Sequence, residues 1–451
     1  MSIRPLAEFV ADFDLVDAPD EVVLEARRQL FDCVGVIVGA STVPEIEALA
    51  ALEGRDTGVS TMLGLRGGVS AESAALVNGT AGVWLDFDSG QRYSGSHPGI
   101  HVVSAALAIA EEVDASGEEL LEGLIVGLEV GARIGVAAGR LRPGMSPHGG
   151  WAVLGAAAAV ARLLGYDVDA IEETINLASS LTLLSSTSVH TAGANVRHLQ
   201  AGLGAQRAIV AARLQMDGFT GDPDGVAEVF GGFVTPSFNS RRARVDLGRR
   251  WELMRGYFKP HACARFGQAA IDALLAIRRD RASAGIHADD VLAIDVVTLA
   301  AAAAAALTDR HPESELGAKF SLPHTLAAAW VRGDAGPASF DQTARRYPAI
   351  RRLADRVRLS EDPDYTALAP DYRPATVTVR FRDGSSQTVE RLNAGGERDD
   401  PLLSRWLVEK FESLVSPTLG RAATVLLREH LLDGEPTLSA RELTALAIST
   451  R

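Results

Sequence analysis

The sequence predicts a mainly α-helical protein with a large helical domain built from both ends of the chain and a smaller α+β lid domain inserted between them. Apolar residues recur at helical spacing through the first half, alternating segments occur only past about residue 255, and helical spacing returns after Asp400. The expected boundaries are residues 1–256 and 399–451 for the helical domain and residues 257–398 for the lid domain.

Helical patterns in the first half are separated by Gly, Pro and Asp, and no long alternating strand interrupts them. Pro98 stands where a helix is expected to begin, and a residue without an N–H group suits a first helical turn. The clearest expected helices are Asp20–Val38, Glu72–Leu85, Pro98–Val113 and Gly150–Leu164.

A row of glycines at every fourth position predicts one narrow ridge along a further helix, which a neighbouring helix can approach closely. Packing inside a membrane is a poor alternative because Glu122, Glu129 and Arg133 would then lie in lipid. A phosphate loop is also disfavoured, since the spacing is not G-x-G-x-x-G. The glycines of this ridge are Gly123, Gly127, Gly131, Gly135 and Gly139.

The lid domain is predicted from strand patterns. Residues 291–299 alternate, and residues 374–392 form two alternating segments joined through Asp383 and Gly384, a strong hairpin signal. The alanine run 300–306 is compatible with a helix or with the end of a strand.

Charge and cysteine content restrict the partners. The 451-residue chain has a formal net charge of −14, which disfavours binding to nucleic acid or anionic lipid. Its two cysteines, Cys33 and Cys263, form neither a disulfide framework nor a thiolate metal site. The first residues lack the apolar core of a secretory signal, and no apolar run reaches about 18 residues. We expect a cytoplasmic protein without a membrane partner.

Two aspartates lie at the expected end of the helix 72–85. Negative charge is unfavourable there because of the helix dipole, so Asp86 and Asp88 are either surface acids capping a loop or part of a site. His97 and His101 follow around Pro98. A metal pair would need a third ligand, and the sequence offers no H-E-x-x-H motif or cysteine set, so no metal is expected.

Histidines and cations recur at other junctions of loop and helix. His148 lies in a Pro/Gly loop, and Arg197 and His198 stand at a helix start, where a cation and free N–H groups can hold a carboxylate. Further members of this kind are Lys259, His261, Cys263 and Arg265 within seven residues, and Lys319 and His324 around a Ser-Leu-Pro break.

Several segments occur in a familiar order along nearly the whole chain. They are "QLFDCVGVIVGAS", "DFDSG", "SHPG", "HGGWAVLGAAAAVARLLG", "RHLQAGLGAQRAIVAARLQMDGFTG", "KPHACARFGQAAIDAL" and "AKFSLPHTLAAA". With these segments the chain resembles the MmgE/PrpD family, which includes 2-methylcitrate dehydratase, cis-aconitate decarboxylase and iminodisuccinate epimerase. The resemblance implies a helical domain with an α+β lid, and a homodimer that uses neither metal nor organic cofactor. The alanine-rich helices and the glycine ridge also favour a homodimer.

Carried over by position, the resemblance places Asp86, His97, His148 and Lys259 in a catalytic cleft. We expect Arg197, His261, Arg265 and His324 to bind the substrate. The chain departs from the family pattern at Ser89 and Gly90, where relatives such as the decarboxylase have Asp and Thr, at Arg197, where Lys is common, at His324, where Tyr is common, and at Gly267-Gln268, where His is common.

These residue types suit the removal of a proton beside a carboxylate. A histidine can act as the base, and Lys or Arg can meet the negative charge that builds on the carboxylate. Loss of a β-hydroxyl would then give dehydration, reprotonation would give epimerisation, and loss of CO₂ would give decarboxylation. A lyase of the 2-methylcitrate-dehydratase type, acting on a small di- or tricarboxylate, is the leading hypothesis, and a helical dimer without catalytic activity is the alternative from another class.

For the base, His148 is preferred, with His97 as its partner and Asp86 orienting one of them, although the two histidines can exchange roles.

Overall fold

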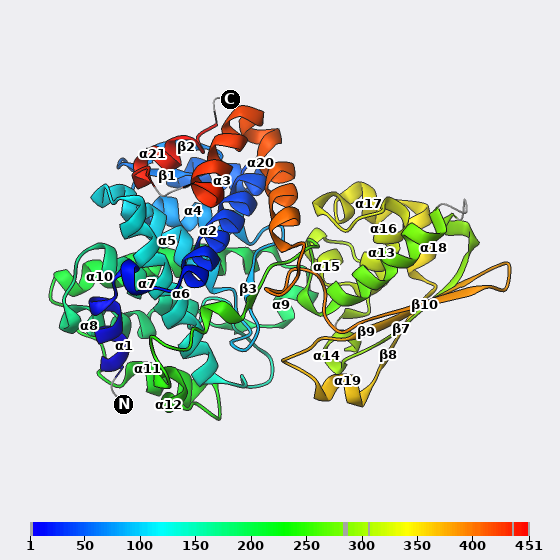
Figure 1. Ribbon diagram of the computed structural model, residues 1–451, viewed down its shortest axis with the longest axis horizontal. Coiled ribbons are helices and arrows are strands. Elements are labelled where there is room, and N and C mark those ends of the chain that lie inside the picture. Colours follow the sequence, from blue (N-terminus) through cyan, green and yellow to red (C-terminus); the bar gives the residue numbers. More distant parts are fainter. Residues whose placement is uncertain (1–2, 283–286, 305–306, 435–436, 450–451) are drawn as a thin grey trace.

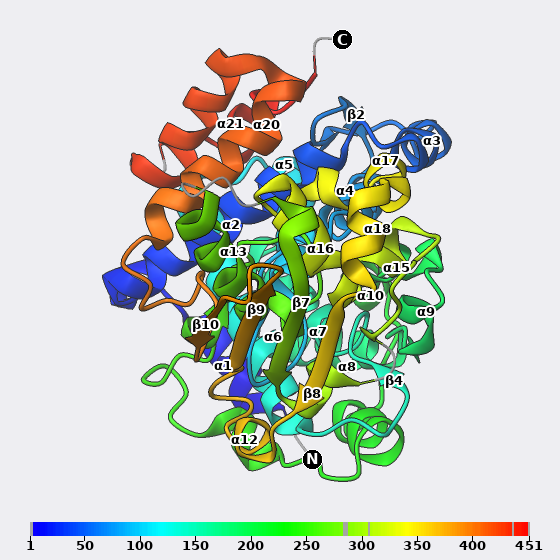
Figure 2. The ribbon, with the colours of Figure 1, turned by 90° about the vertical axis from the view of Figure 1, so that its right-hand side faces the viewer.

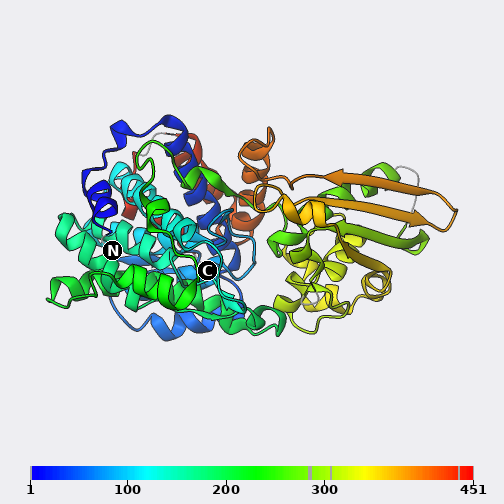
Figure 3. The ribbon, with the colours of Figure 1, turned by 90° about the horizontal axis from the view of Figure 1, so that it is seen from below.

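The computed structural model describes residues 3–282, 287–304, 307–434 and 437–449. Helices gather at one end of its long axis, and a mixed β-sheet with further helices lies at the other end (Figures 1 and 3). The prediction of a mainly α fold with a small sheet is therefore confirmed.

The helical end contains the predicted helices almost as expected. The helix expected at 98–113 has those bounds, whereas the one expected at 72–85 already ends at Gly82. The longer helices here are α1 (Arg4–Asp12), α2 (Asp20–Ala40), α3 (Pro44–Glu53), α4 (Ala71–Gly82), α5 (Pro98–Val113), α6 (Gly117–Ala138), α7 (Ala152–Leu163), α8 (Val168–Ser180) and α10 (Leu199–Met216). Shorter ones are α9 (Ser188–Thr191), α11 (Gly225–Ala227) and α12 (Ser240–Arg244). The short strands form antiparallel pairs: β1 (Ser60–Met62) with β2 (Arg66–Val69), β3 (Gly90–Gln91) with β6 (Gly256–Tyr257), and β4 (Met145–Ser146) with β5 (Ser185–Ser186).

The glycine ridge of α6 packs against α7. A Cβ atom added at Gly127 would lie 2.7 Å from the Cβ of Ala159, and one added at Gly155 of α7 would lie 2.4 Å from the carbonyl oxygen of Gly127. The backbones thus approach closely because neither helix carries a side chain at the crossing. Since α7 covers this ridge within one chain, the ridge offers no surface to a second copy.

The C-terminal helices α20 (Leu403–Arg428) and α21 (Ala440–Ala445) return to the helical end (Figure 1). The rings of Phe31 in α2 and Phe411 in α20 stack at 4.0 Å between centroids, and Lys410 Nζ donates to Asp32 Oδ1 at 2.6 Å. Both ends of the chain therefore share one core.

The sheet has the strand order β10-β9-β7-β8 (Figure 2). The predicted hairpin 374–392 is the antiparallel pair β9 and β10, with Gly384 in its turn at a φ of 86°. Strand β8, which the sequence analysis did not predict, is parallel to β7. The strands are β7 (Val291–Thr298), β8 (Val357–Glu361), β9 (Ala375–Phe381) and β10 (Ser386–Arg391).

Helices cover one face of this sheet. Side chains of β9 alternate, with Val377 and Val379 buried and Thr376 and Thr378 only partly buried, because α13 and α16 pack on one face alone. Of the alanine run 300–306, residues 300–303 are helical, and positions 305 and 306 lie outside the described residues. The helices of this end are α13 (Gln268–Ala282), α14 (Ala300–Ala303), α15 (Glu315–Lys319), α16 (Leu322–Arg332), α17 (Gln342–Arg346), α18 (Pro348–Ala354) and α19 (Pro363–Ala367).

Among the described residues, no single helix has both the length and the apolar composition of a membrane span. The pair α2 and α3 meets these criteria only jointly, with a bend of 98° between the two helices.

Candidate active site

The segment after α4 carries the two aspartates and is held by buried cations. Each of four side chains donates to a different backbone carbonyl of residues 83–87, and the four come from distant parts of the chain. The bonds are Arg197 Nη1 to Val83 at 3.2 Å, Lys319 Nζ to Trp84 at 2.8 Å, Lys259 Nζ to Asp86 at 2.9 Å, and Lys410 Nζ to Phe87 at 2.7 Å.

These cations suit a helix C-terminus, whose last carbonyls lack partners in the helix and carry partial negative charge. With its carbonyls held in this way, the chain turns through Asp86 at a φ of 51°, a left-handed conformation that aspartate tolerates better than most residues. The turn points the carboxylates of Asp86 and Asp88 at different partners.

The Asp86 carboxylate is buried between two cations. Its Oδ1 accepts a hydrogen bond from Arg197 Nη2 at 3.0 Å, and its Oδ2 lies 3.4 Å from Lys259 Nζ. Burial alone would raise the pKa of Asp86, but Lys259 and Arg197 outweigh it and lower that pKa to about 2. Burial alone would lower the pKa of Lys259, but the carboxylates of Asp86 and Asp88 outweigh it and raise that pKa. Asp86 and Lys259 are therefore both charged near neutrality.

Asp88 lies beside His97. The Nδ1 atom of His97 is 2.7 Å from Asp88 Oδ2 and 2.8 Å from the backbone oxygen of Ser89. Two oxygens at this distance require a proton on Nδ1, so Nε2 is the nitrogen of this ring that can act as an acceptor. His97 and Lys259 outweigh burial and lower the pKa of Asp88, which is therefore ionised.

His148 has the opposite tautomer. Arg197 Nη2 donates to His148 Nε2 at 3.2 Å, so the proton of the neutral ring is on Nδ1. Burial and the charge of Arg197 hold the pKa of His148 well below its usual range. Its ring stacks on that of His97 with centroids 5.0 Å apart.

A third histidine, His190 of α9, joins this pair. Its ring centroid lies 5.7 Å from that of His148, and its Nδ1–H donates to the Thr187 carbonyl at 3.0 Å. Burial and Arg197 lower its pKa to about 4. The sequence analysis missed His190 because a single histidine in a Ser/Thr-rich segment matches no motif.

A cavity of about 650 Å³ brings these groups together, a volume within the usual range of small-molecule sites. Both ends of the molecule line it. Its wall includes six of the eight predicted site residues, namely Asp86, His97, His148, Arg197, Lys259 and Arg265, together with His190, Tyr257, Phe266, Phe320 and Arg373.

The other two predicted site residues do not line this cavity. The Nε2 atom of His261 contacts Asp272 Oδ1 at 2.8 Å, and that of His324 donates to the Ser339 carbonyl at 3.1 Å. Both rings stabilise the sheet-containing end of the molecule. Among the described residues, no group of three or more His, Cys, Asp or Glu side chains could hold a metal ion.

The departures from the family pattern at Ser89, Gly90 and Gln268 have a structural explanation. Ser89 turns away from the cavity wall, and its hydroxyl donates to Gln29 Oε1 at 2.5 Å. A Cβ atom added at Gly90 would lie 2.4 Å from the Tyr257 hydroxyl, so the absence of a side chain at 90 makes room for Tyr257. Gln268 holds the loop before α13 by donating to the carbonyls of His261 and Cys263.

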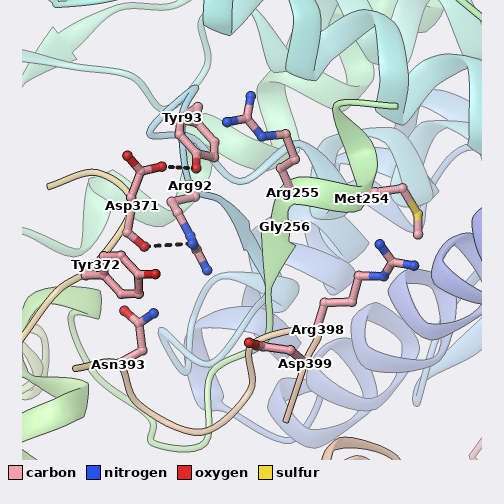
Figure 4. Close-up of a pocket in the computed structure, with 10 residues that line it drawn as sticks. All are labelled: Arg92, Tyr93, Met254, Arg255, Gly256, Asp371, Tyr372, Asn393, Arg398 and Asp399. Carbon is pink, nitrogen blue, oxygen red and sulfur yellow. Dashed lines mark hydrogen bonds between the residues drawn. The ribbon is translucent and has the colours of Figure 1, made fainter. Parts of the chain in front are cut away.

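A second cleft, of about 690 Å³, lies on the surface (Figure 4). Its arginines are already engaged: Arg92 donates to the Asp371 carbonyl at 2.7 Å, the Arg255 guanidinium lies 3.4 Å from the Tyr93 ring centre, and Arg398 pairs with Glu21. No histidine lines it, so the cavity at Asp86 is the better candidate for acid–base chemistry.

The fold and the cavity thus describe a mainly helical protein with ionised carboxylates, cations and histidines around one small-molecule site. Comparison with family profiles agrees: the MmgE/PrpD N-terminal domain matches residues 4–246, and the MmgE/PrpD C-terminal domain matches residues 261–433. The chain belongs to the MmgE/PrpD family, which includes dehydratases and related enzymes, and is an enzyme in this general sense. A search of curated proteins found no match.

Proposed function

We propose that the protein is a cofactor-independent lyase of the 2-methylcitrate-dehydratase type, which removes a proton beside a carboxylate of a small di- or tricarboxylate. The observation that carries this proposal is the pair of oxygens at His97 Nδ1, from Asp88 and Ser89. They hold a proton on Nδ1, so Nε2 is the ring nitrogen that would exchange a proton with a substrate in the cavity that His97 lines. A carboxylate behind an imidazole is a common arrangement for a catalytic base.

The geometry favours His97 over His148 as the base. The Nε2 lone pair of His148 already accepts a hydrogen bond from Arg197, and the lowered pKa makes this ring a weak base. His148 instead presents its Nδ1–H as a neutral donor. The group that orients the base is Asp88, because Asp86 is engaged by Arg197 and Lys259.

In the proposed step, His97 Nε2 takes the proton from the carbon beside the carboxylate, and the electron pair of that C–H bond moves toward the carboxylate. Lys259 and the Nδ1–H of His148 meet the charge that develops there. The electron pair then forms the double bond as the β C–O bond breaks. The imidazolium of His97, stabilised by Asp88, gives its proton to the departing hydroxide, which leaves as water.

The stacking of His97 on His148 supports dehydration over epimerisation. With ring centroids 5.0 Å apart, both imidazoles lie on one wall of the cavity. An epimerase that uses two histidines needs them on opposite faces of the reacting carbon. An elimination needs only one histidine, which first removes the proton as a base and then protonates the leaving group as an acid. Epimerisation, isomerisation and decarboxylation by the same proton removal are the alternatives that the experiment below separates.

We also propose that residues 257–398 act as a lid. This part supplies Lys259, Arg265 and Arg373 to a cavity whose histidines belong to the helical end. Its separation from the helical end would open the cavity to solvent.

The test is proton exchange in heavy water with a panel of hydroxylated di- and tricarboxylates, followed by NMR. The wild-type protein should place deuterium on the carbon beside a carboxylate of at least one acid and release the unsaturated product. His97→Gln should lower the exchange rate at least about 100-fold, His148→Gln less, and His261→Gln, outside the cavity, not at all.

Wild-type exchange in His97→Gln would show that His97 is not the base. Exchange that yields the opposite stereoisomer and no alkene would identify an epimerase, and release of CO₂ a decarboxylase. If the wild-type protein exchanges no acid of the panel, the chain fits the alternative of a non-catalytic helical protein.

A further inference from the structure

Positive charge in the cavity is unbalanced beside Tyr257. Near the histidines, the cations Arg197 and Lys259 face the anions Asp86 and Asp88, so charge is balanced there. Beside Tyr257, the cavity is lined by Arg265 and Arg373. Glu397 pairs with Arg265 through Oε1 and, through Oε2, with Arg92 of the surface cleft, but it forms no ion pair with Arg373.

Arg373 is a partly buried cation without an ion pair to any described carboxylate. Its Nη1 is buried and makes no hydrogen bond to a described residue. The rings of Tyr257 and Phe266 lie 5.9 and 6.0 Å from it. These contacts offset only part of the cost of removing the guanidinium from water. Burial accordingly lowers the pKa of Arg373 to about 10.

Arg265 offers a second donor at the same place. Its guanidinium lies 4.2 Å above the Tyr257 ring, and its Nε is buried without a hydrogen-bond partner in the part of the chain that the structure describes. Arg265, Arg373 and both aromatic rings line the cavity. The backbone of Arg373 is fixed at the sheet edge, where its N–H donates to the Leu392 carbonyl and to Asn393 Oδ1.

We propose that Arg373, with the Nε of Arg265, binds a second carboxylate of the substrate, remote from the carbon that loses the proton. This proposal rests on the proposed function and specifies its substrate: an acid with at least two carboxylates. A planar guanidinium can bind a carboxylate through two parallel hydrogen bonds, which would hold the reacting carbon at a fixed distance from His97.

The test uses matched pairs of probe acids that differ by one carboxylate, succinate against butyrate and glutarate against pentanoate, with affinities measured by titration calorimetry at constant ionic strength. For at least one pair, the wild-type protein should bind the dicarboxylate at least about tenfold more tightly, as expected for a charged hydrogen bond in a buried site. Arg373→Met should reduce this ratio to below about threefold while the affinity for the monocarboxylate stays unchanged.

Two further variants make the result specific. Arg373→Lys, which retains charge but not the planar fork, should give an intermediate ratio. Arg398→Met, which removes an arginine of the surface cleft in Figure 4, should keep the wild-type ratio. Melting curves without ligand verify that each variant is folded, and loss of a partly buried cation without an ion pair should not lower the melting temperature.

A wild-type protein that shows no preference for either dicarboxylate would overturn the proposal, as would an Arg373→Met variant that keeps the full ratio. Because binding requires no turnover, the outcome is separate from that of the exchange experiment. A ratio that collapses in Arg373→Met supports the carboxylate site even if His97→Gln exchanges protons normally.

Discussion

Asp86 and Asp88 are two positions apart, yet they serve different chemistry. The left-handed turn at Asp86 directs its carboxylate to Arg197 and Lys259, while the next carboxylate reaches His97. Asp86 therefore holds the cations of the cavity, and Asp88 holds His97, the proposed base.

Replacement of Asp88 by Asn should lower kcat by at least about 100-fold with little change in KM, because the variant cannot stabilise the imidazolium of His97 and can stabilise the wrong tautomer. Steady-state kinetics on the substrate found in the exchange screen would measure this. Asp272→Asn is the matched control, since Asp272 also contacts a histidine, His261, but outside the cavity. Equal losses in both variants would contradict a special role of Asp88.

At this scale, motifs identified the residues that lie beside either end of a helix or in a Pro/Gly loop. Asp86, His97 and His148 belong to this kind, and all three line the cavity. His190 and Arg373 lie in segments whose local pattern is ordinary, and only the tertiary fold brings them to the site. The role of His324 was predicted from its position in a motif, but its ring faces the Ser339 carbonyl instead.

Among the elements, the crossing of α6 and α7 determines how closely these two buried helices approach. Gly155 meets the backbone of Gly127 and Gly131 at a distance that leaves no room for a methyl group. Gly155→Ala should destabilise the protein by about 1–3 kcal/mol, because the helices must separate or bend.

Urea denaturation would measure this change. Gly232→Ala is the control: nothing lies within 4 Å of a Cβ atom at Gly232, so its effect should stay within about 0.5 kcal/mol. If Gly155→Ala is as stable as Gly232→Ala, the close crossing is not a rigid feature of the core.

The helices were predictable because their apolar spacing is regular, but their ends were not. Residues 83–85 continue the apolar pattern of α4 and are buried, yet they form a turn because buried cations bind their carbonyls. Strand β8 was not predicted because it lies at the sheet edge, where buried and exposed side chains do not alternate along it. In both places the contacts that decide the structure come from distant residues.

For the whole molecule, five buried histidines have lowered pKa values and predict a protein that loses stability in mild acid. Burial is the main cause in each, and the pKa is about 4 for His101, His190 and His324. As the pH falls, the unfolded chain binds protons at these histidines near pH 6.5, before the folded protein does. The contribution of the neutral histidines to the free energy of unfolding is therefore fully present above pH 6.5 and is lost as the pH falls below it. The other two are His148 and His198.

Each such histidine contributes up to about 1.4 kcal/mol per pH unit below pH 6.5. Buried Glu25 and Glu129, whose pKa values are raised by burial, reduce this slope because they bind protons first in the folded protein. We expect a net loss of at least about 3 kcal/mol between pH 7 and pH 5 in urea denaturation. Equal stability at both values would contradict the neutral state of the buried histidines.

The homodimer that the family resemblance implies is a proposal about the whole molecule. Light scattering at micromolar protein concentration tests it. Its interface would have to use a surface other than the glycine ridge, which α7 covers. A mass of 47.6 kDa at every concentration would show that the chain is a monomer.

The four cations that hold residues 83–87 also bear on how the protein is synthesised. They lie at positions 197, 259, 319 and 410, so a ribosome completes the helix α4 long before it makes the last of them. Until Lys410 has emerged and α20 has docked, the turn at Asp86 lacks a partner for the Phe87 carbonyl. We therefore expect a nascent or truncated chain that lacks α20 to contain folded helices without the complete turn at Asp86, so that any activity of the proposed site would report chains that extend through α20.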